Sequence, residues 1–204
     1  MGLLAATTSI CRYRVNGRLE EPILDTIAAG LKKFAINDID GNPSEQAVGW
    51  TSFENPYLPD FEDSNFVMGT ALVFALRLDK KTIPNKLVQK HVTAECAKRL
   101  KESGREHLSA NEKKMIKDHV LNMLNMKIPA TPNVYDVVWH YEQGDLWFFS
   151  NLKGANEQLE TLFAKTFHLN LIRRIPYTMA ADAPQLKDHQ RDALLKLTPE
   201  GHAS

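Results

Sequence analysis

The stretch Val134–Ser150, VYDVVWHYEQGDLWFFS, is the clearest local unit of the sequence and predicts a β-hairpin. Its first half is rich in β-branched and aromatic residues, which favour strands. The pair Gln143-Gly144 supplies a turn, after which the second strand begins. Side chains alternate along a strand, so Trp139 and Tyr141 share one face. We therefore expect most aromatic residues of the hairpin to pack into a core instead of stacking on nucleic-acid bases.

Strands and helices are predicted on both sides of this hairpin. Strands are expected at residues 6–15, 66–78 and 171–177, and helices at 22–34 and 155–167. Residues 37–63 are rich in Gly, Pro, Asn and acids without a sustained period, which predicts an irregular segment. The resulting order is β-α-β, a helical insertion and β-β-α-β. This order is typical of an α+β fold with a mainly antiparallel sheet and helices on one face.

The chain divides into a core and an insertion. Residues 1–83 and 127–180 are expected to form the α+β core, residues 84–126 an inserted helical pair, and residues 181–204 a C-terminal tail or helix. With 204 residues and 43% hydrophobic content, the chain can form a packed core. A basic leader and a membrane-length apolar run are both missing, and only two cysteines occur, far apart. A cytoplasmic location without membrane contact is therefore expected.

The inserted segment is basic although the whole chain has a net charge of zero. Between Arg77 and Lys117 twelve Lys or Arg residues stand against five acids, a local charge of +7. Pro84 and Asn85 open the first predicted helix, and Ser109 with Glu112 forms a capping box for the second. Two helices with outward lysines would present positive charge to a polyanion. The candidate DNA-binding residues are Lys80, Lys81, Lys86, Lys90, Lys98, Lys101, Lys113, Lys114, Lys117 and Lys127.

The same helices have a second interpretation, because exposed lysines are also the ordinary surface of soluble helices. In the second helix the apolar period predicts a core side that includes Met115, Ile116, His119, Val120, Met123 and Leu124. On this interpretation the pair is an assembly module, without a nucleic-acid role, that meets an acidic protein partner.

Catalytic and metal-binding motifs are weak. Seven histidines and two cysteines lack zinc-site spacing, and the Gly-rich nucleotide and serine-hydrolase motifs are missing, so neither metal nor cofactor is expected. One alternative is a Mg²⁺-dependent nuclease of the PD-(D/E)xK type, in which Asp60 and Asp79 hold the metal and Lys81 activates water. Asp79 and Lys81 would point to the same side of a strand. Glu112-Lys113-Lys114 matches the same short pattern, which lowers its specificity.

Several landmarks, in order from Tyr13 to Pro176, resemble the RdgC recombination-associated family. They are Tyr13-Arg14-Val15, Gly49-Trp50, Ile83-Pro84, Glu112–Leu121, Tyr141–Leu146 and Leu159–Phe167. Lys127 stands where the family has an arginine after the basic helix. The chain is similar to a short member without the family's C-terminal region.

The resemblance implies a function without a catalytic residue. Members of the family bind double-stranded DNA without strong sequence preference, restrain the RecA recombinase and form dimers that close into a ring. We therefore expect a nucleoid-associated, non-enzymatic DNA-binding protein that forms a homodimer or higher oligomer and limits recombinase access to DNA. The basic helices are the part of the chain that would contact the duplex.

Overall fold

A single antiparallel sheet organises the computed structural model, which describes residues 2–62, 65–175, 178–179 and 187–194. The strand order is β2-β4-β5-β6-β1-β7, with β3 paired to β4 outside this path. The strands are β1 Cys11–Asn16, β2 Gln46–Thr51, β3 Val67–Met68, β4 Ala71–Lys80, β5 Thr131–His140, β6 Asp145–Phe148 and β7 Asn170–Arg173. Each strand pair is antiparallel, and the expected α+β class is confirmed.

Two helices, α1 (Ile23–Lys33) and α4 (Lys153–Phe167), pack on one face of this sheet. Their apolar residues join the inward side chains of the strands in the main core. The ring of Trp139 is fully buried there, with its centroid 5.0 Å from that of Phe163 on α4. The helices therefore occupy the face of the sheet that carries Trp139, and the opposite face has no helix from this pair.

The predicted hairpin is confirmed as β5 and β6, with Val137 opposite Phe148 and Trp139 opposite Leu146. Its aromatic residues behave as expected, because Trp139, Phe148 and Phe149 are buried. The alternation predicted for the first strand also holds, although β1 begins only at Cys11.

The expectation of an irregular segment at residues 37–63 was wrong in one part, because this segment contains β2. This strand pairs with β4 from Gln46 opposite Lys80 to Thr51 opposite Ala75. Gly49, one of the glycines of this segment, permits close backbone approach. A Cβ atom there would lie 2.5 Å from the Cα of Ile36, well inside van der Waals contact.

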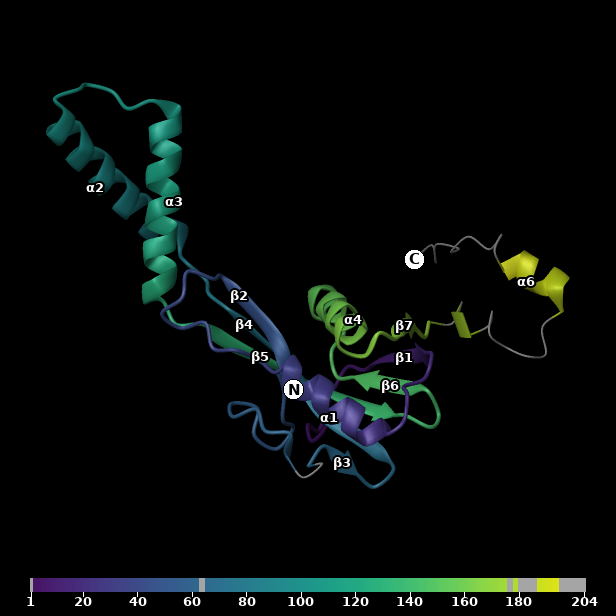
Figure 1. Cartoon of the computed structure of the whole chain (residues 1–204). Coiled ribbons are helices and arrows are strands. Elements are labelled where there is room, and N and C mark those ends of the chain that lie inside the picture. Colours follow the sequence, from purple (N-terminus) through teal and green to yellow (C-terminus); the bar gives the residue numbers. More distant parts are fainter. Residues whose placement is uncertain (1, 63–64, 176–177, 180–186, 195–204) are drawn as a thin grey trace.

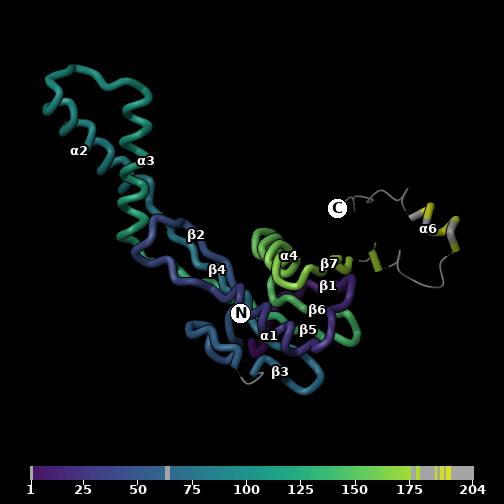
Figure 2. Tube along the Cα trace, in the orientation of Figure 1, coloured from purple at the N-terminus to yellow at the C-terminus, as the bar shows by residue number. Residues whose placement is uncertain are grey.

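A two-helix arm projects from one end of the sheet (Figure 1). It consists of α2 (Asn85–Ser103), α3 (Ala110–Lys127) and the loop between them. Figure 2 traces the chain outward along β4, through the arm and back along β5. At the other end of the chain, α6 covers Asp188–Leu194, and the rest of the predicted C-terminal helix lies outside the described residues.

Candidate nucleic-acid interface

The arm has its own small core between α2 and α3. Its buried residues are Val88, Leu108, Ile116, Val120 and Leu124. Met115 and His119, which we had placed on the core side of α3, are exposed instead, Met115 by 62%. A helix with one neighbour buries only a narrow stripe, so residues at the edges of its apolar period stay exposed.

The N-terminus of α3 is fixed by the predicted capping box. The Ser109 hydroxyl accepts a hydrogen bond from the Glu112 amide at 3.2 Å, and the Glu112 carboxylate accepts one from the Ser109 amide at 2.9 Å. Arg105 also donates to this carboxylate, at 2.6 Å. These hydrogen bonds, led by the Ser109 amide, lower the pKa of Glu112 to about 2.

This geometry predicts a pH dependence of the arm. A depressed pKa means that the ionised carboxylate stabilises the folded arm above pH 4.5, its ordinary pKa, and that this contribution is lost between pH 4.5 and about 2. We expect a carboxyl NMR titration of Glu112 to give a midpoint near 2. Replacing Arg105 with glutamine should raise that midpoint, because one charged donor is removed. An ordinary midpoint in both proteins would contradict the capping geometry.

Nine of the ten candidate lysines are exposed. Within the described part of the arm, the ion pair between Arg105 and Glu112 is the one present, so these lysines have no carboxylate partner there. Helical spacing directs Lys86, Lys90 and Lys101 away from α3. On α3, helical spacing puts Lys113 on the same side as the stripe that packs on α2, and Lys117 beside that stripe. The positive charge therefore covers more than one side of the arm.

The tenth candidate, Lys81, is 5% exposed and is not available to DNA. Its ammonium donates to the carbonyl oxygens of Ile39, Asn42 and Asn125 at 2.7, 2.6 and 2.6 Å. The Asn125 carbonyl belongs to the last turn of α3, where carbonyls lack partners within the helix. Nearby, the Asp40 carboxylate accepts the Ala130 amide at 2.8 Å. We call these contacts the Lys81 joint, because they fasten the base of the arm to the loop after α1.

The three residues of the nuclease alternative are engaged in separate contacts. The Asp79 side chain is 2% exposed and both of its oxygens accept hydrogen bonds from Arg77, at 2.8 and 2.6 Å. These bonds raise the pKa of Arg77. Asp60 is exposed and accepts the Glu62 amide, and Lys81 is saturated by carbonyl oxygens. Asp79 and Lys81 are both buried, but the two residues serve different structural contacts.

In the stretches that the structure describes, none of the helices is both long and apolar enough to cross a bilayer. No group of three acidic, histidine or cysteine residues is placed to hold a metal ion among the residues described. No protein-family model matches the chain, and a search of curated proteins finds no match. The resemblance to the RdgC family therefore stays a prediction.

Proposed function

We propose that this protein binds double-stranded DNA through the arm and without sequence preference. The observation that carries the proposal is the exposure of Lys86, Lys90, Lys98, Lys101, Lys113, Lys114 and Lys117 on a projecting helical pair whose described part holds a single ion pair. Lysine binds phosphate as a point charge, which fits contacts to the DNA backbone.

The dimensions of the arm suit a duplex. Its first helix has 19 residues, so it is about 28 Å long, the axial length of about eight base pairs. Charge on more than one side of the arm allows phosphates to be contacted by both helices. Binding then depends on the release of counterions from the duplex, which makes the affinity strongly dependent on salt.

A titration of the full chain against two unrelated duplexes at several salt concentrations tests the proposal. We expect equal affinities for both sequences. The logarithm of the association constant should fall linearly with the logarithm of the salt concentration, by about 0.9 for each phosphate neutralised. A flat salt response, or a strong preference for one sequence, would overturn the proposal.

By occupying DNA in this way, the protein would limit the access of a RecA-type recombinase, as the resemblance to the RdgC family implies. We propose on the same basis that it is nucleoid-associated in the cytoplasm and acts as a homodimer or higher oligomer. It would need neither cofactor nor metal for this role, because its own charged side chains make the contacts with the phosphate backbone of DNA.

One observation favours a second candidate, a protein–protein assembly module. Met115 and Met126, 62% and 54% exposed, lie on one face of α3 that is turned away from α2. Exposed methionines are adaptable contacts for protein partners. Substitution of both methionines by glutamine would weaken a contact with a protein partner and leave the affinity for DNA unchanged.

A further inference from the structure

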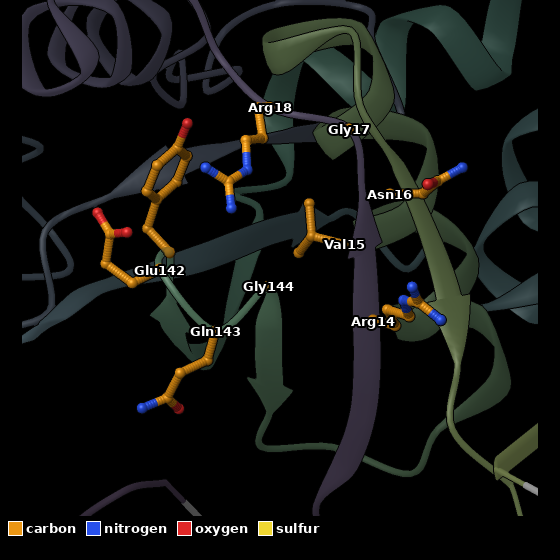
Figure 3. Close-up of a pocket in the computed structure, with 9 residues that line it drawn as sticks. Arg14, Val15, Asn16, Gly17, Arg18, Glu142, Gln143 and Gly144 are labelled. Carbon is orange, nitrogen blue, oxygen red and sulfur yellow. The ribbon is translucent and has the colours of Figure 1, made fainter. Parts of the chain in front are cut away.

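The two outermost strands of the sheet differ in how their outer edges are covered. The edge of β2 is closed by the segment after α1, because the Trp50 amide donates to the Phe34 carbonyl and the Ile36 amide to the Trp50 carbonyl, each at 2.9 Å. At the other end of the sheet, β7 pairs with β1 alone (Figure 1). Figure 3 shows β7 beside β1 at Asn16, whereas the cavity in that view lies toward the hairpin turn at Gly144. The outer edge of β7 therefore has no strand partner among the described residues.

Backbone groups on this edge point away from the sheet. The Arg174 amide donates to the Arg12 carbonyl at 2.7 Å, so every second residue of β7 faces β1. The amides of Leu171 and Arg173 and the Leu171 carbonyl therefore face outward, without a hydrogen-bond partner in the described part of the chain. The Arg173 carbonyl accepts the Thr178 hydroxyl at 2.8 Å and keeps a second lone pair. One more strand would satisfy all of these groups.

The side chains along this edge are apolar and basic. Ile172 and Ile175 are 40% and 45% exposed. Arg173 is also exposed, and it donates to the Cys11 sulfur at 2.9 Å, which leaves most of its five donors available. No carboxylate is paired with Arg173 among the residues that the structure describes, and the segment 170–175 contains two arginines and no acid. The edge therefore combines unpaired backbone groups with exposed isoleucines and positive charge.

We infer that the outer edge of β7 binds an extended segment of a partner protein, which adds a strand to the sheet and carries acidic residues next to apolar ones. A strand edge with unpaired amides and carbonyls is a template for another strand. The arginines select the partner, because opposite charges across a strand pair attract and like charges repel. The identical edge of a second copy would bring arginines toward arginines. This contact is separate from the arm and does not depend on DNA binding.

The register of such a pairing fixes the order of residues in the partner segment. An antiparallel strand runs opposite to β7, so its first two residues lie opposite Arg174 and Arg173 and are acidic. The next two lie opposite Ile172 and Leu171 and are apolar. The residue opposite Leu171 exchanges two hydrogen bonds with it, since the amide and the carbonyl of Leu171 both face outward. The expected recognition pattern is therefore acid-acid-apolar-apolar.

The test titrates the full chain with the peptide acetyl-Glu-Glu-Val-Val-Thr-amide and follows the backbone amides of Leu171 and Arg173 by NMR. A first control peptide has lysine in place of both glutamates. Two further controls carry one N-methyl group each. The group is placed on the valine opposite Leu171, whose N–H faces β7, or on the valine opposite Ile172, whose N–H faces away. Arg173→Gln and Arg18→Gln are the matched protein variants, because Arg18 is exposed and lies outside β7.

The acidic peptide should shift the amides of Leu171 and Arg173. The lysine peptide should bind about tenfold more weakly, because two attractive pairs become repulsive. N-methylation opposite Leu171 should weaken binding by about tenfold, through the lost hydrogen bond, and N-methylation opposite Ile172 should leave it unchanged. Arg173→Gln should lower the affinity for the acidic peptide by about threefold, and Arg18→Gln should have no effect.

Three results would overturn the inference: no shift with the acidic peptide, equal affinities of the acidic and lysine peptides, or equal affinities of the two N-methyl peptides. A shift of the same amides on raising the protein concentration alone would assign the edge to a second copy. A shift with duplex DNA and none with the acidic peptide would assign it to DNA. Either result would also overturn the inference. Thermal unfolding of both variants checks that their folds are intact, and the salt titration of DNA binding is independent of all these outcomes.

Discussion

Replacing Lys81 with methionine is expected to lower the free energy of unfolding by about 3 kcal/mol, a large effect for one residue. The ammonium group of Lys81 has three donors, and three carbonyl oxygens accept them. Methionine has a similar length and fills similar space, so the substitution removes the hydrogen bonds with little change in packing. The buried Asn125 carbonyl would then be left without this donor, whereas the Ile39 carbonyl would keep only the hydrogen bond from the Asn42 amide at 3.0 Å.

The size of this effect follows from two opposing terms. Each buried carbonyl that loses its partner costs about 1–3 kcal/mol. The variant also avoids burying a charge, and this offsets part of the loss. The last turn of α3 is an additional reason for a net cost, because a cation near the C-terminal carbonyls of a helix is stabilised by the helix dipole. Destabilisation therefore prevails.

Chemical denaturation of Lys81→Met and Lys80→Met, side by side, measures the difference. Lys80 is the adjacent residue and is exposed, so its substitution should change the stability by less than about 0.5 kcal/mol. Hydrogen exchange provides a local readout. The Ile128 amide, which donates to Leu124 at 3.0 Å at the end of α3, should exchange faster in Lys81→Met alone. Equal small effects of both substitutions would show that the Lys81 joint does not hold the arm.

Lys80 and Lys81 also show where prediction from the sequence stops. Alternation along β4 separates the two lysines, and Asp79 and Lys81 are indeed both buried. The partners that give them their roles come from Arg77 and from residues 39, 42 and 125, and this pairing depends on the path of the chain after α1. The sequence alone therefore does not distinguish a buried lysine, whose partners are carbonyl groups far away in the chain, from a lysine on the surface.

Local signals were sufficient elsewhere. The β5–β6 hairpin and the Ser109 capping box depend on contacts between residues close in the chain, and both were predictable. Strand β2 was missed because Gly49 is needed where the backbone of Ile36 approaches closely. The local sequence pattern does not reveal this approach. The exposure of Met115 was missed for a related reason, since it depends on how many neighbours α3 has. The exposed lysines of the arm could be predicted, but not the sides on which they lie.

Neutralising four arm lysines is expected to reduce the affinity for duplex DNA by roughly a thousandfold at about 0.1 M salt. The variant K86Q/K90Q/K113Q/K117Q removes two charges from each helix and leaves the Lys81 joint and the Arg105–Glu112 pair intact. If each lysine neutralises one phosphate, the salt slope should become less steep by about 3.6. Glutamine is a good helix former, so the arm should keep its structure.

A matched variant on the two helices that pack on the sheet, K32Q/K33Q/K153Q/K165Q, removes the same formal charge from α1 and α4. We call it the body variant. Because a long-range effect of net charge would weaken binding in both variants, only a contact between DNA and the arm predicts a difference between them. The body variant should keep nearly the wild-type slope, with its smaller loss confined to low salt, where long-range attraction is least screened. Equal salt slopes in the two variants would mean that the duplex does not lie against the arm. The exposed lysines of α2 and α3 would then be ordinary hydrated surface residues of soluble helices.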